Sequence, residues 1–169
     1  RLGRRAGRIP RAAVERDFSA RERLLDTAGR LMSDRHSIDV SLSEIAGHSG
    51  LNSALVKYYF GNKNGLLLAL VEREAAAALQ GFKELLRQDL PPTEKLRRHI
   101  AGIINNFFRT PYLNRLLHSL LDDRQSRSAR QVQRIFVQPV MELQRELLAE
   151  GMRAGEFKQV DPVLFYVSV

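Results

Sequence analysis

The chain has 169 residues, no cysteine and a formal net charge of +8, so it can bury one hydrophobic core of ordinary size but cannot form disulfides or thiolate metal sites. Its 44% hydrophobic and 27% charged residues are typical of a folded globular protein and exclude global disorder. No apolar run reaches the roughly 18 residues of a membrane-spanning helix, and no signal peptide is recognisable. We therefore expect a cytoplasmic protein with no membrane partner.

Much of the positive charge lies at the start of the chain. Residues 1–16 hold six Arg and one Glu, a net charge of +5. This segment has glycines, a proline and little apolar surface, so we expect residues 1–17 to form a flexible basic arm. Arg side chains on such an arm suit A·T-rich minor grooves, with Arg4, Arg5 and Arg8 as the candidate contacts. The alternative is a solvated tail that adds only nonspecific affinity.

An amphipathic helix is predicted from Ala20 to about Ser33. Ser19 and Glu22 have the spacing of a capping box, in which each side chain bonds the other residue's backbone N–H. Apolar residues then recur at helical spacing: Leu24, Leu25, Ala28, Leu31 and Met32. We expect this face to support the two helices that follow.

The segment from Ser41 to Lys63 predicts a helix, a tight turn, a second short helix and the start of a third. Ser41 and Glu44 form another capping box, Gly50 has the position of a left-handed residue that ends a helix, and Asn52 can cap the next one. Such a helix–turn–helix often places its second helix in the major groove of DNA. Short two-helix turns also occur in helical bundles that bind no DNA.

The second of these helices has two different sides at about 3.6 residues per turn. Its apolar side is suited to packing: Leu55, Val56, Tyr59 and Phe60. The other side is small and polar at its start and then offers a cation and a phenol to phosphates or base edges: Ser53, Ala54, Lys57 and Tyr58. The alternative interpretation of this second side is a solvated helix face.

Together these motifs resemble the DNA-binding domain of the TetR family of transcriptional regulators. The resemblance covers roughly Arg21 to Leu70 and is carried by the following residues: Ser41, Glu44-Ile45-Ala46, Gly50-Leu51-Asn52, Tyr58-Tyr59-Phe60, Lys63 and Leu66. Two positions depart from the family pattern, because a Tyr usually stands at Lys57 and a His is frequent at Tyr59. Lys57 can add a charge-assisted phosphate contact of its own.

The resemblance implies a dimer that binds a palindromic DNA operator. The candidate DNA contacts outside the arm are Ser41, Ser43, Asn52, Ser53, Ala54, Lys57, Tyr58, Tyr59 and Lys63. Lys63 follows the capping residue Asn62 and begins a long helix to about Gln88, where free N–H groups attract an anion such as a phosphate.

The rest of the chain has helical patterns and no strand signal. We expect helices over 93–109, 111–121 and 128–152, the last one kinked by Pro139. Asp161-Pro162 is a cap and first-position pair for a further helix, which is cut off at Val169. Since the last two helices usually form the dimer interface in the TetR family, we expect part of that interface to lie outside this sequence.

The resemblance also implies a small-molecule cavity in the C-terminal part. Its candidate lining is Phe82, Leu86, Ile103, Asn106, Phe107, Leu117, His118 and Phe136. Any one of these residues can instead belong to an ordinary core. His118 and Asp122 have i, i+4 spacing, but two ligands make no metal site, and we expect a surface ion pair and no metal or cofactor.

The fold class is therefore predicted as all-α, with a basic arm (1–17), a three-helix DNA-binding domain with a helix–turn–helix (18–64) and a helical effector and dimerisation domain (65–169). The sequence has no catalytic motif of a serine hydrolase, P-loop enzyme or zinc protease, so we expect no enzyme. We predict a ligand-responsive regulator, most simply a repressor released by an unknown small molecule. The alternatives are an architectural DNA-binding protein without an effector, and a helical small-molecule-binding protein whose helix–turn–helix is incidental.

Overall fold

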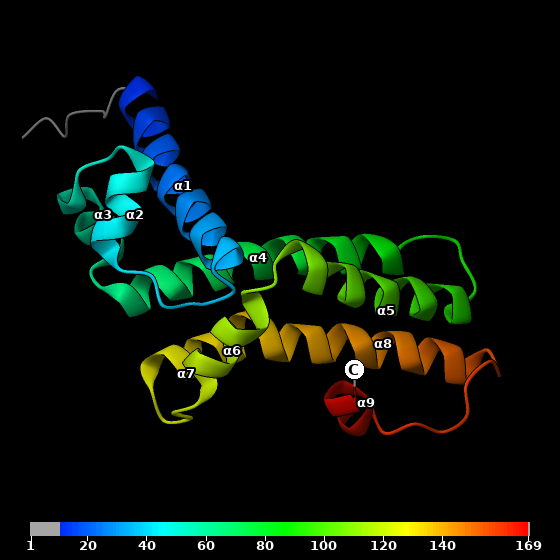
Figure 1. Ribbon diagram of the computed structural model, residues 1–169. Helices are drawn as coiled ribbons and strands as arrows, with labels where there is room; N and C mark the ends of the chain where they lie inside the picture. The colour runs from blue at the N-terminus through cyan, green and yellow to red at the C-terminus, as the bar shows by residue number, and fades with distance from the viewer. Residues whose placement is uncertain (1–10, 169) are drawn as a thin grey trace, which may run out of the picture.

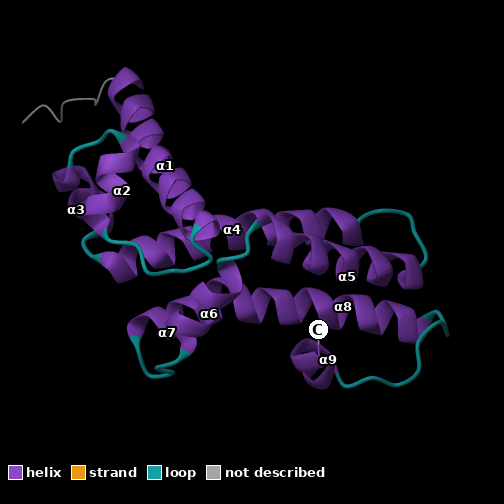
Figure 2. Ribbon diagram, in the orientation of Figure 1, coloured by secondary structure: helices purple, strands orange, loops and turns teal. Residues whose placement is uncertain are grey.

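The computed structural model describes residues 11–168, and within that range every regular element is helical (Figure 2). In chain order the elements are α1 (Arg11–Asp34), α2 (Leu42–Ser49), α3 (Ser53–Phe60), α4 (Lys63–Leu86), α5 (Pro92–Arg109), α6 (Leu113–Leu121), α7 (Arg127–Val132), the π-helical turn η1 (Gln133–Val137), α8 (Gln138–Arg153) and α9 (Pro162–Ser168). The predicted all-α class is confirmed. None of the described helices is long and apolar enough to cross a membrane.

The ends of α2 and α3 are set by the capping residues that the sequence predicts. The backbone N–H of Glu44 donates to Ser41 Oγ at 3.2 Å, and the N–H of Ser41 donates to Glu44 Oε2 at 2.8 Å. Gly50 ends α2 at φ 65°, a left-handed conformation that only glycine adopts without a steric cost. Asn52 Oδ1 then accepts the N–H of Ala54 at 2.8 Å. These local hydrogen bonds set the turn between the two helices.

Helix α1 is longer than the sequence predicts. It begins at Arg11 and not at Ala20, so Ser19 lies inside the helix and the capping box predicted for Ser19 and Glu22 is wrong. Residues 11–17, expected as part of the flexible arm, are helical. Ala and Arg have high helix propensity, so they extend the helix towards the N-terminus. Residues 1–10 lie outside the described range.

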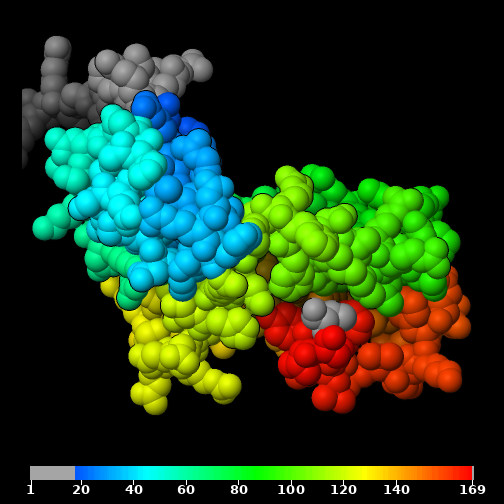
Figure 3. Space-filling view, in the orientation of Figure 1, coloured from blue at the N-terminus to red at the C-terminus, as the bar shows by residue number. Residues whose placement is uncertain are grey.

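The helix–turn–helix packs on α1 through one shared core. Leu24, Leu25 and Met32 of α1 are fully buried, as are Ile45 of α2 and Val56 of α3. These α-helices and the start of α4 form one lobe, which stands apart from the lobe built by α5, α8 and α9 (Figure 3).

Helix α4 belongs to both lobes. Its first half buries Leu66 and Leu70 in the core of the helix–turn–helix lobe, and its second half buries Phe82 in the C-terminal lobe. There α4, α5 and α8 lie side by side, α6 and α7 pack beneath the junction, and α9 packs on α8 (Figure 1). A displacement of α4 would therefore be transmitted to both lobes.

The predicted irregularity at Pro139 takes the form of a π-helical turn. Pro139 has no N–H to donate to the carbonyl group of Ile135, four residues earlier. The five residues before Gln138 widen into η1, and Gln138 N–H donates to Gln133 O. The interruption is therefore present, but it lies on the N-terminal side of the proline and not at the proline itself.

A buried ion pair joins α5 to α8. The side chain of Lys95 is only 6% exposed, and its Nζ lies 2.8 Å from Glu150 Oε1. The same ammonium group donates to the carbonyl oxygen of Leu86 near the end of α4, at 3.0 Å. One cation thus connects three helices of the C-terminal lobe.

We expect Glu150→Ala to lower the free energy of unfolding by about 2 kcal/mol, less than for a fully buried pair because Glu150 is itself 36% exposed. The physical reason is that the Lys95 ammonium group stays buried without its carboxylate. Urea denaturation measures the change. Glu146→Ala removes the same group from an exposed position of α8 and should lower the free energy of unfolding far less. Equal losses in the two variants would show that the pair of Lys95 and Glu150 adds no stability of its own.

Candidate functional site

The outer face of α3, formed by Ser53, Ala54, Lys57 and Tyr58, is exposed to solvent along its whole length. Tyr58 is 75% exposed, whereas Val56 is 0% and Phe60 8% exposed on the opposite side. The helical wheel therefore predicts correctly which side packs and which side is free. Small residues at the start of the helix allow a close approach to a polar surface, and Lys57 and Tyr58 supply a cation and a phenol.

The other candidate contacts lie around this face. Ser41, Ser43 and Asn52 are exposed at the starts of α2 and α3, and the side-chain oxygens of Ser41 and Asn52 already accept capping hydrogen bonds. The α2 capping box also lowers the pKa of Glu44 to about 2, through the Ser41 backbone N–H first and then through Arg35. Glu44 therefore stays ionised and caps the start of α2.

Two predicted contacts are less available than the outer face of α3. Tyr59 is half-buried against the core, and its ring lies 5.1 Å from that of Tyr58. Lys63 Nζ lies 2.8 Å from Asp39 Oδ1, so a phosphate at the start of α4 would have to compete with this carboxylate. Arg4, Arg5 and Arg8 lie outside the described residues.

A cavity of about 620 Å³ lies in the C-terminal lobe, between α4, α5, α6 and α8. Six of the eight residues that the sequence pattern selects line it: Phe82, Ile103, Asn106, Phe107, Leu117 and Phe136. The other two do not. Leu86 lines a separate, smaller hollow between α4 and α8, and His118 is exposed on α6.

The expected ion pair between His118 and Asp122 is also wrong. Among the described residues no salt bridge joins them, and no group of three or more potential metal ligands occurs there. Both side chains lie on the exposed side of α6, because Leu116 and Leu120 occupy its buried side.

Several polar residues of the cavity were not predicted from the sequence. His99 and Gln144 line it and are almost completely buried, at 9% and 2% exposure. Helical spacing offered a signal for both, since His99 lies four residues before Ile103 and Gln144 lies four residues after Val140. Glu74 of α4 and Thr110, just after α5, also line the cavity.

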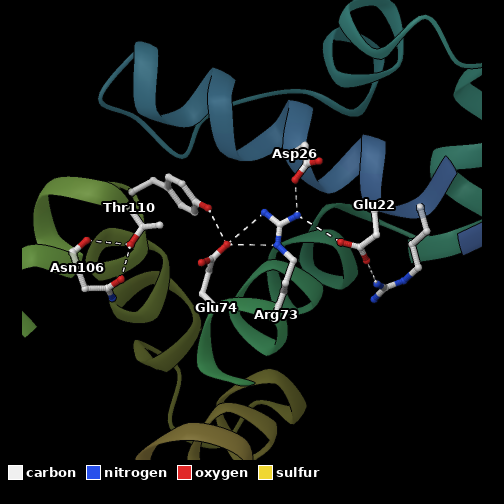
Figure 4. A network of polar contacts seen from close by, with 8 residues as sticks. Glu22, Asp26, Arg73, Glu74, Asn106 and Thr110 are labelled. Carbon is white, nitrogen blue, oxygen red and sulfur yellow. Dashed lines mark hydrogen bonds and ion pairs between the residues drawn. The ribbon is translucent and has the colours of Figure 1, made fainter. Parts of the chain in front are cut away.

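A cluster of charges around Arg73 lies where α1 crosses α4 (Figure 4). Arg73 Nη1 donates to Asp26 at 2.7 Å and lies 3.5 Å from a carboxylate oxygen of Glu22, both on α1. Arg73 Nη2 donates to Glu74 Oε1 at 3.2 Å. Because Glu74 also lines the cavity, two side chains span the distance from the cavity to the first helix of the helix–turn–helix lobe.

Tyr112 completes this junction from the start of α6. Its ring is buried against α1, and its hydroxyl group donates to Glu74 Oε1 at 3.3 Å. Burial and the Glu74 charge raise the pKa of Tyr112 to about 12. A Cβ at Gly29 of α1 would lie 2.9 Å from the Tyr112 hydroxyl, so the absence of a side chain there is what allows the close approach.

Two protein-family models match the chain. The model for bacterial regulatory proteins of the tetR family matches residues 24–70, and the model for the tetracyclin repressor-like C-terminal domain matches residues 89–169. The first range contains the helix–turn–helix, and the second contains most of the cavity lobe. The chain therefore belongs to the TetR family.

Relatives from Brucella and Rhizobium support this membership. The HTH-type transcriptional regulator BetI of Brucella anthropi is 31% identical over 121 residues, which are 69% of this chain and 60% of the relative. BetI of Rhizobium meliloti is 41% identical over 51 residues, or 30% of this chain and 25% of the relative. The chain thus spans less than two thirds of the length of these relatives.

Solved structures share the fold at low sequence identity. The fatty acid degradation regulator FadR from Bacillus halodurans superposes with a TM-score of 0.70 at 19% identity, over 87% of this chain and 79% of that one. A gamma-butyrolactone receptor gives 0.70 at 20%, over 90% and 75%. FadR from Bacillus subtilis, solved in complex with stearoyl-CoA, gives 0.68 at 21%, over 87% and 79%.

We expect Gly29→Ala to destabilise the protein by roughly 1–3 kcal/mol, because the new methyl group forces Tyr112 away from α1. Gly47→Ala in α2 is the matched control, since a Cβ there meets no atom within 4 Å. The control should stabilise its helix by about 0.5–1 kcal/mol. Urea denaturation followed by circular dichroism measures both free energies of unfolding. If Gly29→Ala is as stable as the wild type, the contact between Gly29 and Tyr112 does not contribute to stability.

Proposed function

We propose that this protein is a transcriptional regulator that binds a palindromic DNA operator as a dimer and is released by a small molecule. The observation that carries the proposal is the exposed outer face of α3, held by an α2–α3 turn whose capping residues are all in place. Membership of the TetR family supports the same interpretation. Such a protein acts on the bacterial chromosome, hence in the cytoplasm, and needs no catalytic group.

In this proposal each subunit lays α3 in the major groove of one half-site. Ser53 and Ala54 lie at the start of the helix, where small side chains permit a close approach to base edges. Lys57 and Tyr58 lie one turn further on, where they can reach the phosphates or base edges. Ser41, Ser43 and Lys63 flank this contact, and phosphate contacts of this kind position the helix without reading sequence.

The dimer would be formed by the C-terminal lobe. Helix α9 exposes three apolar side chains, Val163, Leu164 and Val167, at 49%, 67% and 72%. A second copy of the chain would remove such a surface from water. Two reading helices held at a constant separation then require a palindromic site, because the symmetry of the operator mirrors that of the protein.

The Arg73 cluster suggests how a ligand would act. A molecule in the cavity that contacts Glu74 competes with Arg73 and Tyr112 for the same carboxylate. Loss of these bonds would loosen α1 and α6 on α4 and favour a different spacing of the two reading helices. The ligand shifts the population of two states only as far as its affinities for them differ. Two proteins of the same fold are a FadR solved in complex with stearoyl-CoA and a gamma-butyrolactone receptor.

Lys57→Ala tests the DNA contact. The variant should bind an operator selected from random DNA more weakly, and the slope of log affinity against log salt should fall by about 0.9 for each phosphate that the protein no longer neutralises. Electrophoretic mobility shift at several salt concentrations measures both quantities. Lys158→Ala removes an equally exposed lysine from the loop before α9 and should change neither. An unchanged affinity and slope for Lys57→Ala would show that Lys57 does not contact DNA. If the selection from random DNA enriches no palindrome, the proposed function is wrong.

Deletion of residues 1–10 tests the basic arm, which contains Arg4, Arg5 and Arg8. If these side chains enter a minor groove, affinity should fall more for operators with A·T-rich flanks than for those with G·C-rich flanks, because narrow A·T grooves concentrate negative potential. The same shift assay compares the two flanks. Equal losses on both would mean that the arm contributes only general electrostatic attraction.

A further inference from the structure

The inner wall of the cavity holds one buried polar atom without a partner. Gln144 of α8 is 2% exposed, and its Nε2 lies 3.0 Å from His99 Nε2. Its other amide atom, Oε1, is buried and has no hydrogen-bond partner. A buried carbonyl oxygen with no donor is costly to leave unpaired and is uncommon in folded proteins. Gln144 lines the cavity, so a molecule bound there would lie beside this side chain.

His99 holds the Gln144 amide in one orientation. The imidazole ring stacks on Phe82, with centroids 3.8 Å apart and an angle of 12° between the planes. Burial lowers the pKa of His99 to about 4, so the ring is neutral at pH 7. With its proton on Nδ1, Nε2 accepts from Gln144 Nε2, and the amide oxygen turns away from the histidine.

Several other polar side chains of the cavity already have partners, while Arg109, Asn114 and Tyr166 line it from exposed or only partly buried positions. The single hydroxyl hydrogen of Thr110 is shared between two acceptors of Asn106, the backbone oxygen at 2.9 Å from Oγ1 and the side-chain Oδ1 at 3.1 Å. Arg98 Nε donates to Glu94 at 2.8 Å. Glu74 accepts from Arg73 and Tyr112. Among the described lining residues, Gln144 Oε1 is the buried side-chain atom whose need for a donor is unmet.

The rest of the wall is mostly apolar and partly aromatic, with Phe82, Ile103, Phe107, Leu117, Phe136 and Val140. We infer that the cavity takes a neutral, largely apolar small molecule that carries a hydroxyl or amide N–H and donates it to Gln144 Oε1. A carboxylate at this end would face a carbonyl oxygen and lose its hydration. This inference rests on the proposed function, since it names the ligand class of the same effector cavity.

Three probes with the same naphthalene ring test it: 1-naphthol, which donates a hydrogen bond, 1-methoxynaphthalene, which does not, and 1-naphthoate, which is charged. Dissociation constants are measured at pH 7 on the full chain without DNA, by ligand-observed NMR. We expect 1-naphthol to bind roughly fivefold or more tighter than the ether, as one hydrogen bond to an otherwise unpaired group allows, and 1-naphthoate to bind most weakly. Equal binding of the first two, tightest binding of 1-naphthoate, or no binding of any probe overturns the inference.

Variants then assign the preference to one atom. Gln144→Leu should reduce the difference between 1-naphthol and the ether to less than about twofold while the ether still binds, because the acceptor is gone and the apolar wall remains. Gln159→Leu, in the exposed loop before α9, should leave the ranking unchanged. A retained preference in Gln144→Leu overturns the inference. Thermal denaturation checks folding, and Gln144→Met repeats the test with a side chain of similar shape.

A variant of the opposite wall, on α5, shows whether the probes bind in the cavity. Gly102 lines the cavity from α5, and a Cβ there meets no atom within 4 Å. Gly102→Leu should therefore fill part of the space and weaken all three probes, while helix propensity favours the folded state. Unchanged binding would place the probes elsewhere and overturn the inference. Operator binding by the same preparations is measured separately. If the protein binds DNA but the order of the three probe affinities differs from the expected one, only the inferred ligand class is wrong. If the protein binds no DNA, the proposed function is wrong.

Discussion

The Arg73 guanidinium group forms the polar contact between α1 and α4, beside the apolar core that also joins these helices. It lies on α4, the helix that both lobes share, and pairs with Asp26 and Glu22 of α1 on one side and with Glu74 on the other. Glu74 is 19% exposed and Asp26 is 73% exposed, so solvent screens the pair with Glu74 less than the pair with Asp26. These hydrogen bonds join α1 to α4, and α3 packs on both of these helices.

The same junction lies beside the cavity, and this proximity gives the molecule its proposed mechanism. Glu74 is at once a wall residue and the acceptor for Arg73 and Tyr112. Gly29 lets the Tyr112 ring lie directly against α1. A change in the cavity therefore needs no long path to reach the DNA-binding lobe, because one carboxylate belongs to both. In this mechanism Gln144 and His99, on the inner wall, determine which molecules bind. Contact of the bound molecule with Glu74 then determines whether the hydrogen bonds to Arg73 and Tyr112 are kept.

Local chemistry explains where the sequence-based predictions succeed. Capping by Ser41, Asn52 and Asn62, and the left-handed Gly50, involve atoms within four residues of each other, so their spacing in the chain is enough to locate the helix ends. The predicted start of α1 is wrong because Ser19 and Glu22 have the spacing of a capping box, whereas the good helix formers before them continue the helix. The π turn is not predictable in the same way, because Pro139 signals that a hydrogen bond is missing, but not how the backbone rearranges around it.

The sequence by itself determined the all-α class, the helix–turn–helix and the division of α3 into a packed and an exposed side, because periodicity and capping act over one or two helical turns. The resemblance to the TetR family, which implies a cavity in the C-terminal part, also led to six of the residues that line it. Only the tertiary structure decided that Leu86 and His118 face elsewhere, that Gln144 meets His99 across 45 positions of the chain, and that Arg73 joins α1 to the cavity wall. Such contacts depend on how whole helices are placed against each other, and the packing that places them is not encoded in any single segment.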